Sequence, residues 1–459
     1  MSFQSKKPVK SKNFSRTAVV SQEDLFKIEL RSMCDPREEL YQLAEKIPWK
    51  EIEEGLSKLD KGVGRPRKEI RRMVGLLILK QLENLSDEQI VRRWSRDPYY
   101  QFFCGETHFQ WGRPCVDNLL THFRQDIGEK GVETIFKISV KMHGDEVQKE
   151  DTVVIDTTVQ EMNTTYPTDT KLRRRIIEKL WKMGEEAAIK WDHSYVRTVP
   201  KLLRTLRTRS NAMVKARRKA ENKLKTLAGR LLREFTRKAS SGWQRIFEED
   251  LKLFERVLSE GRSDSHKVYS LHDPGIYCLA KGKAHQKYEF GRKASVSILA
   301  ESGVIVGALS HSENLYDGHT LGEVLYHSKK ISGLKPESAL VDRGYQGPKA
   351  VLGTRIIRPD DRFPKGSYYK RRKERKRRAR RSAIEPVIGH LKYDYRLRRC
   401  YLKGEEGASM NLQMAAAVWN LRQWMRKHLF GLILSWLRRG YLAIGSHNKG
   451  HPRPFLVYA

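Results

Sequence analysis

The sequence predicts an α/β protein, in which a mixed sheet with flanking helices follows a helical segment and is interrupted by a long helical insertion. Two apolar runs predict the sheet: residues 153–155 lead into Asp156, and residues 339–341 lead into Asp342. Short apolar runs rich in β-branched residues that stop at polar or turn residues are typical of buried strands. The insertion is predicted over residues 171–262, which are basic, poor in Gly and Pro, and helical in their apolar spacing.

The composition indicates a large soluble protein with a polyanionic partner. The chain has 459 residues, of which 39% are hydrophobic, so it can bury a sizeable core. Its formal net charge is +35, from 90 Lys and Arg against 55 Asp and Glu. Such an excess favours nucleic acid, because each phosphate contact releases counterions. A ribosome-associated or merely solvated basic protein is the alternative.

Cysteine spacing and apolar runs indicate a cytoplasmic protein. The five cysteines are scattered and form no CxxC pair, which fits neither a zinc site nor a disulfide framework, so we expect reduced, mostly buried thiols. The basic N-terminus lacks the apolar stretch of a signal peptide. The strongest apolar run, residues 429–437, is about half of what a membrane helix requires.

The first third of the chain is expected to bind DNA. Residues 1–45 are polar and basic, and we interpret them as a flexible arm; residues 46–145 are predicted to form a helical DNA-binding domain. There Ser86 is an expected helix N-cap, and Arg65 and Arg67 lie in a basic turn and are expected to contact DNA. Several short Arg-rich helices fit a helix-turn-helix-like module, although small helical domains of other functions are equally common.

The predicted catalytic domain covers residues 146–410 and contains the helical insertion. The strand before Asp156 is expected to end there and to be followed by a second strand or hairpin over residues 157–167. Within the insertion, three-and-four spacing of apolar residues over 220–235 predicts a helical hairpin or coiled-coil arm. A solvated spacer, a DNA clamp and a dimerisation arm remain open as its role.

The second half of the domain is predicted to complete the sheet. Strands are expected at residues 268–271, 288–298 and 303–309, with the last two in an antiparallel meander. A dense basic run at 365–381 is expected to guide DNA towards the carboxylates. Residues 411–459 are predicted to form an amphipathic helical tail whose tryptophans pack in the core or against another subunit. The basic run supplies further expected DNA contacts at Arg371, Arg372 and Arg378.

Asp156, Asp342 and Glu385 form a candidate catalytic and metal-binding trio. Carboxylate oxygens suit hard divalent cations, and two Mg²⁺ ions can stabilise the attacking and leaving oxygens of phosphodiester chemistry. We therefore expect two Mg²⁺ ions here, with Mn²⁺ as a substitute. If the helix around Glu385 extends backwards, Arg381 and Lys392 share its face and can grip a phosphate; an ordinary surface ion-pair ladder is the alternative.

The neighbouring Pro386 qualifies this helix, because proline is tolerated in a first turn and so indicates that Glu385 lies near the helix start. Arg381 would then precede the regular helix. No HExxH, Walker A, dinucleotide or nucleophile motif competes with the carboxylates. Phosphoryl transfer with two metal ions is thus the favoured hypothesis for an enzymatic function.

At these residues the chain resembles the DDE transposases of bacterial insertion sequences, in particular the insertion-sequence-five type, which have an RNase H-like core. The resemblance covers most of the chain. The matching stretches are Ile47-Pro48-Trp49, Gly64-Arg65-Pro66, Asn84-Leu85-Ser86-Asp87, Val154 to Thr158, Lys281 to His285, Tyr288 to Gly291, Tyr316-Asp317-Gly318-His319, Asp342 to Gly347, and the Arg381, Glu385, Lys392 pattern.

The resemblance implies that Asp156, Asp342 and Glu385 are the DDE triad of an endonuclease and strand-transfer enzyme, and that Arg381 and Lys392 contact DNA. Its implied partners are double-stranded DNA, as element ends and target, and further copies of the chain in a homodimer or larger synaptic assembly. It also implies a bacterial cytoplasm, associated with the nucleoid. A stand-alone metal-dependent nuclease and a catalytically inactive DNA-binding derivative are the rival functions.

One departure from the family pattern concerns Arg378. Related transposases often carry a tyrosine three residues before the position of Arg381, and here that position is Arg378. Any base-gripping role of that tyrosine is therefore in doubt for this chain.

Overall fold

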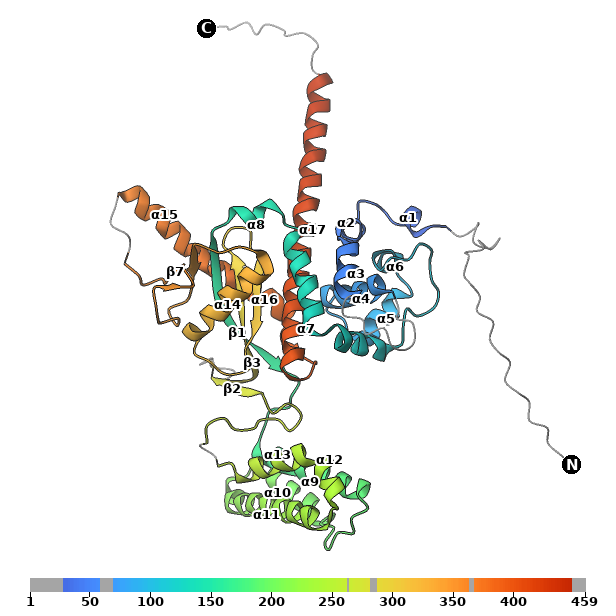
Figure 1. Cartoon of the computed structure of the whole chain (residues 1–459), viewed down its shortest axis with the longest axis vertical. Helices are drawn as coiled ribbons and strands as arrows, with labels where there is room; N and C mark the ends of the chain where they lie inside the picture. Colours follow the sequence, from blue (N-terminus) through green and yellow to red (C-terminus); the bar gives the residue numbers. More distant parts are fainter. Residues whose placement is uncertain (1–27, 58–68, 262–263, 281–286, 363–366, 448–459) are drawn as a thin grey trace, which may run out of the picture.

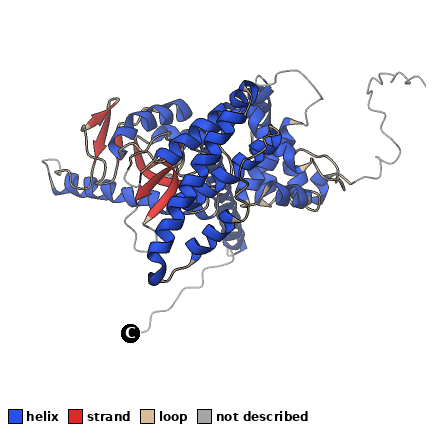
Figure 2. Cartoon of the chain, turned by 90° about the horizontal axis from the view of Figure 1, so that it is seen from below, coloured by secondary structure: helices blue, strands red, loops and turns tan. Residues whose placement is uncertain are grey.

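The computed structural model describes residues 28–57, 69–261, 264–280, 287–362 and 367–447. The basic turn with Arg65 and Arg67, the first 27 residues of the expected arm and the block 281–286 lie outside the described residues. Within them, the mixed α/β architecture is confirmed: helices surround one mixed sheet, and a separate group of helices lies at one end of the molecule (Figures 1 and 2).

The sheet is built around β1 (Thr152–Met162). β1 pairs antiparallel with β3 (Tyr288–Leu299) on one side and parallel with β5 (Ser338–Leu340) on the other. β3 also pairs antiparallel with β2 (Tyr277–Ala280) and β4 (Ile305–Ser310), which confirms the expected meander of β3 and β4. The smaller strands are β6 (Ala350–Val351), β7 (Thr354–Ile357) and β8 (Arg399–Cys400).

Asp156 lies in the middle of β1, so the expectation that a strand ends there is wrong. The segment from Thr157 to Met162 continues the same strand and pairs with β3, with Asp156 opposite Val296 and Glu161 opposite Gly291. The consecutive β-branched residues Thr157, Thr158 and Val159 favour this extended conformation, and no second strand or hairpin forms between residues 157 and 167. The carboxylate therefore projects from a continuous strand.

Helices before the sheet pack into its hydrophobic core. Ser86 caps one of them, because its side chain accepts from the Gln89 backbone N–H and the Gln89 side chain accepts from the Ser86 N–H, as expected for a capping box. The flexible-arm prediction does not hold for residues 30–33 and 39–45, which are helical and bury Leu30, Leu40 and Leu43. These helices are α1 (Leu30–Met33), α2 (Glu39–Lys46), α3 (Trp49–Ser57), α4 (Ile70–Leu82), α5 (Asp87–Trp94), α6 (Pro98–Phe103), α7 (Asp117–Lys141) and α8 (Asp145–Lys149).

A long C-terminal helix, α17 (Gly404–His447), joins these helices to the sheet (Figure 1). Trp419 and Trp424 are buried, which confirms that they are core residues. Asn420 is fully buried: its side-chain amide donates to the Ile305 carbonyl (2.9 Å) and to the Ser139 hydroxyl (3.2 Å), and its oxygen accepts from the Ile305 N–H (2.8 Å). One polar side chain thus binds strand β4 and helix α7 to α17.

The insertion is a helical bundle with its own hydrophobic core. The periodic residues Leu224, Leu231 and Phe235 of α11 are buried against the neighbouring helices, so α11 belongs to a bundle larger than the expected hairpin. Its helices are α9 (Asp169–Glu186), α10 (Thr198–Arg207), η2 (Asn211–Met213), α11 (Val214–Lys238), α12 (Ser241–Ile246) and α13 (Glu248–Ser259).

The chain leaves and re-enters the sheet on either side of β3. Gly291 of β3 pairs with Glu161 of β1 on one side and with Tyr277 of β2 on the other. A Cβ at Gly291 would lie 2.0 Å from the Gln160 carbonyl oxygen, so a side chain cannot fit there without moving the strand. The segment after the bundle, residues 268–271, is not a strand as expected: Val268 and its neighbours complete the core of the bundle.

All five cysteines lie in the part of the chain that the structure describes. All five cysteines are free and four are buried, which confirms the expected thiols. In the part of the chain that the structure describes, each helix is too short or too polar to cross a lipid bilayer.

Candidate active site

Asp156 and Asp342 lie beside each other because their strands are neighbours. β5 pairs parallel with the start of β1, and Asp342 follows the end of β5 by two residues. Each carboxylate accepts a hydrogen bond from the backbone N–H of the next residue, at 2.8 Å from Thr157 and 2.7 Å from Arg343. These bonds hold both side chains at the surface of the sheet.

Arg381 brings Glu385 to the two aspartates. It lies in the 3₁₀ turn η3 (Arg380–Ala383), just before α16 (Ile384–Tyr393), as the position of Pro386 indicated. Its Nη1 is 3.0 Å from Glu385 Oε1, and its Nη2 is 3.3 Å from Asp342 Oδ2 and 3.9 Å from Asp156 Oδ2. One guanidinium therefore contacts all three predicted carboxylates.

The donor chemistry of this cluster suits a hard divalent cation. Three carboxylates from separate elements meet at a partly open surface: the side chain of Asp156 is 20% exposed, Asp342 45% and Glu385 60%. Among the described residues, however, no three or more His, Cys, Asp or Glu side chains are already arranged as metal ligands. In this conformation the positive charge between the carboxylates is that of Arg381.

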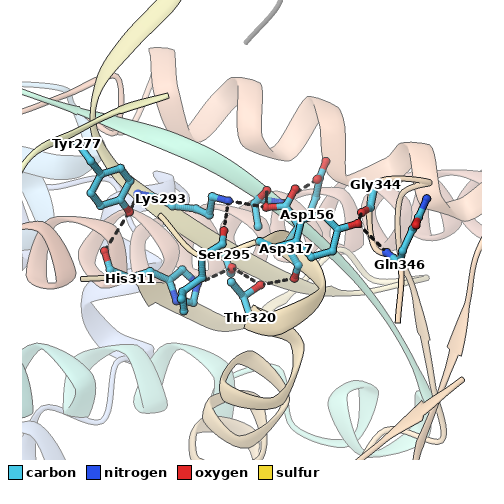
Figure 3. Close-up of polar contacts among 12 residues, drawn as sticks. Asp156, Tyr277, Lys293, Ser295, His311, Asp317, Thr320, Gly344 and Gln346 are labelled. Atoms are coloured by element: carbon cyan, nitrogen blue, oxygen red, sulfur yellow. Dashed lines mark hydrogen bonds and ion pairs between the residues drawn. The ribbon is translucent and has the colours of Figure 1, made fainter. Parts of the chain in front are cut away.

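A second pair of side chains stands behind Asp156 (Figure 3). Lys293 of β3 forms an ion pair with Asp317 at 2.8 Å, and Thr157, the neighbour of Asp156, donates to the same Asp317 oxygen at 3.0 Å. The Lys293 side chain is buried and that of Asp317 is partly exposed, and each stabilises the other's charge. Asp317 begins α14 (Asp317–Ser332), which ties the β1 strand to this helix.

The residue before Asp317 holds the loop that carries Asp342. The Tyr316 hydroxyl donates to the Gly344 carbonyl and accepts from the Gln346 N–H at 3.1 Å (Figure 3). Gly318 permits this close approach, because a Cβ there would lie 2.4 Å from the Gln346 carbonyl oxygen. The turn at residues 316–318 thus links the two segments that bear the aspartates.

Tyr345 supplies a protonated hydroxyl next to the acidic groups. Its side chain is buried, and burial together with the negative charges of Asp156 and Asp317 raises its pKa well above the ordinary value. At neutral pH the group therefore remains a neutral phenol.

Sequence patterns assigned no role to Lys293 or Asp317. Asp317 was visible only as part of the Tyr316-Asp317-Gly318-His319 stretch, where an acid follows a turn at a helix start. Lys293 had no local signal, because a lysine in a strand is usually a solvated side chain, and its partner is 24 residues away.

The predicted DNA-binding residues lie in different environments. Arg371 and Arg372 are exposed on α15 (Tyr368–Ala379). Arg378 is instead turned inward: its side chain is 8% exposed, pairs with Glu374 and donates to the carbonyl of Asp361. Lys392 is half-buried on α16.

Two family models match the chain. The one described as "Transposase domain (DUF772)" matches residues 28–126, and the one described as "Transposase DDE domain" matches residues 264–421, which include Asp342, Arg381 and Glu385. The chain belongs to the DDE transposases of insertion sequences. In this transposase, Asp156 and the helical insertion lie between the two matched regions.

A search of curated proteins adds one relative of the transposase. The chain is 37% identical over 178 residues to an uncharacterised protein, ORF8 in the nfe locus of Rhizobium meliloti; the match covers 38% of the transposase and 86% of that protein. No solved structure matches the transposase significantly.

Proposed function

We propose that this transposase binds the terminal inverted repeats of its element and catalyses DNA cleavage and strand transfer with Asp156, Asp342 and Glu385 as catalytic carboxylates. The observation that supports this assignment most directly is the contact of one guanidinium, that of Arg381, with all three side chains. Ionised carboxylates repel one another, and a cation placed between them offsets that repulsion.

These carboxylates are the groups that would hold divalent metal ions, with Mg²⁺ as the natural choice and Mn²⁺ as a substitute. When bound, such ions activate the attacking oxygen and stabilise the leaving oxygen of phosphodiester cleavage. Arg381, released from the carboxylates, remains within reach of a scissile phosphate. The protonated Tyr345 adds no negative charge to a site that must accept a polyanion.

Helix α15 is the proposed path by which DNA reaches the site. Arg377 anchors this helix to the sheet, because its guanidinium donates to the hydroxyls of Thr152 (2.8 Å) and Ser338. Arg378 is also turned inward, whereas Arg371 and Arg372 are exposed on the same helix. We propose that these two residues bind the phosphate backbone, whereas Arg378 is a structural residue.

The test compares wild type with Asp342→Asn on a DNA fragment that carries the ends flanking the gene, in the presence of Mg²⁺. We expect cleavage to fall at least roughly a thousandfold, equivalent to about 4 kcal/mol of activation free energy, while DNA binding persists. Asp156→Asn should have the same effect.

The matched control is Asp360→Asn, because Asp360 is exposed and pairs with Arg343 rather than with Arg381. This variant should cut normally. Near-normal cleavage by Asp342→Asn would contradict the catalytic assignment. Cleavage without joined products would favour a stand-alone nuclease. Binding without cleavage, in Mg²⁺ and Mn²⁺ and with paired ends, would favour a DNA-binding derivative.

A further inference from the structure

The helical insertion has one strongly basic side. Residues 197–225 contain eleven Lys and Arg and a single acid, Glu221. Nine of the cations are exposed, and we call them the basic face. They are Arg197, Lys201, Arg204, Arg207, Arg209, Lys215, Arg218, Lys219 and Lys223.

The basic face lies opposite the core of the bundle. On α10, the partly buried Leu202, Leu203 and Leu206 pack against the core, and the cations occupy the other side of the helix. On α11, the buried stripe is formed by Leu224, Leu231 and their neighbours. Figure 1 places α10 and α11 on the side of the bundle away from the sheet.

The charges of the basic face are not neutralised by the protein. Within the described residues, none of its nine side chains forms an ion pair or hydrogen bond, and Glu221 is engaged by Arg173 of α9 at 3.4 Å. A cluster of like charges of this kind lowers stability by self-repulsion unless a ligand binds it.

Other Lys and Arg side chains of the same bundle form ion pairs with acidic side chains. Arg174 pairs with Glu178 at 2.7 Å, Lys252 pairs with Glu248 at 2.6 Å, and Lys182 lies 3.9 Å from Glu186. The excess charge of the insertion is therefore concentrated on one side.

We infer that the basic face binds the phosphate backbone of duplex DNA. On α11 the basic-face residues run from Lys215 to Lys223, about 12 Å of helix, which is roughly three to four base-pair steps of duplex DNA. Lys and Arg side chains spaced along such a length can contact successive phosphates without reading the sequence. This surface lies outside the carboxylate cluster and α15, so it is a second place where DNA can bind. The inference rests on the proposed function only for the identity of the ligand, which is DNA.

A second copy of the chain is the competing occupant. Two basic faces would repel each other, so a symmetric interface between them is disfavoured. A contact between the basic face and the acidic first turn of α13, at Glu248 to Asp250, would require a head-to-tail arrangement. The experiment separates this outcome from DNA binding.

The test neutralises three cations of the basic face, Arg204→Gln, Lys215→Gln and Lys219→Gln, in the full-length protein. The matched control neutralises Arg174, Lys182 and Lys252 in the same way, so both variants lose one Arg and two Lys from exposed helix positions. Affinity for a duplex of about 40 base pairs and unrelated sequence is measured by fluorescence anisotropy between about 50 and 200 mM KCl without divalent metal.

We expect the basic-face variant to bind roughly tenfold or more weakly than wild type, and the slope of log K against log salt to fall by about two to three, since each lost phosphate contact changes it by about 0.9. The control should retain the wild-type slope. Equal slopes for both variants, or equal losses in both, would overturn the inference.

Mass photometry of the same variants tests the competing occupant. If the basic-face variant binds DNA normally but no longer self-associates, the surface is an interface between copies and the inference is wrong. Because no metal is present, these outcomes do not depend on catalysis. If the wild-type protein fails to cut DNA, the proposed function is refuted. The anisotropy measurements still test DNA binding by the basic face.

Discussion

The two hydrophobic cores of this transposase are assembled in different ways. The core around the sheet collects residues from α4, α7, β1, β3, α14 and α17, which are hundreds of residues apart in the sequence. The core of the insertion uses only residues between Leu172 and Leu271. The first therefore depends on long-range contacts, whereas the second is encoded by one continuous stretch of helical periodicity.

The two regions also distribute charge in opposite ways. At the sheet, three carboxylates share the single guanidinium of Arg381. On the insertion, nine exposed cations have no acidic partner within the described residues. Charge excess, rather than total charge, thus marks the two surfaces for which we propose a ligand: a cation at the sheet and a polyanion on the insertion.

We expect Phe254→Ala to have the largest effect on stability, and it tests whether the two cores unfold separately. Phe254 is fully buried in the insertion core, so its removal should cost about 3–5 kcal/mol of local stability. Hydrogen exchange should then speed up in residues 169–261 while protection of β1 and β3 is retained.

The companion variant is Phe136→Ala, which removes an equally buried ring from the core around the sheet. It should accelerate exchange in α7, the sheet and α17 but not in the insertion. If either variant loosens both regions alike, the two cores unfold as one unit and the comparison fails.

An intermediate effect is expected from pH, and only in the core around the sheet. Burial lowers the pKa of His327 to about 4, and this side chain stacks near Phe136 and accepts from the Ala308 N–H at 3.3 Å. Below about pH 6.5 the unfolded chain binds a proton that the folded chain does not, so stability falls as pH decreases. Between pH 7 and 5 the loss should be about 2 kcal/mol.

Chemical denaturation of wild type and His327→Gln at both pH values measures this loss. The variant cannot titrate at this position, so its stability should change less between pH 7 and 5. The buried residues of the insertion core include no histidine, so exchange in the insertion should follow pH only weakly. An equal pH response in wild type and variant would exclude His327 as the source.

The smallest effect is expected from Tyr316→Phe, which removes the hydroxyl that links α14 to the loop of Asp342. Losing this positioning contact should reduce cleavage about tenfold, or about 1.4 kcal/mol. It should also raise the Mg²⁺ concentration needed for half-maximal cleavage and leave DNA binding unchanged.

Tyr326→Phe is the control, because Tyr326 lies on the same helix with 66% of its surface exposed. It should behave as wild type. If Tyr316→Phe changes the melting temperature but not the Mg²⁺ dependence, the contact is structural and does not position Asp342.

Sequence patterns predicted local features well and long-range pairings poorly. The cap at Ser86, the helix start near Glu385 and the apolar stripe of α11 depend on residues within a few positions of each other, and all three are confirmed. The strand of Asp156 was placed too short, because its second half is held by pairing with β3 across the insertion. The Lys293–Asp317 pair was not predicted, because it too joins residues that are distant in the sequence.

The candidate site shows the same division. A carboxylate after an apolar run was enough to single out Asp342, and spacing was enough to connect Arg381 with Glu385. The sequence does not predict that Arg378 points into the protein. Its partners include the backbone carbonyl of Asp361, and the amino-acid composition of a loop does not predict the loop's geometry. The catalytic role of the carboxylates stays a prediction until the variants are assayed.

The position of Gly291 between the two connections of the insertion has a mechanical consequence. Since Glu161 and Tyr277 flank it on adjacent strands, the two stalks of the bundle emerge about 10 Å apart, the width of two strand spacings. A domain held by two such close tethers can swing about the line that joins them but resists twisting. A linker that replaced the bundle would have to cover this distance and also pass over β3. Because the gap is narrow, a loop could do so, and the whole bundle could be gained or lost without a change in the strand order of the sheet.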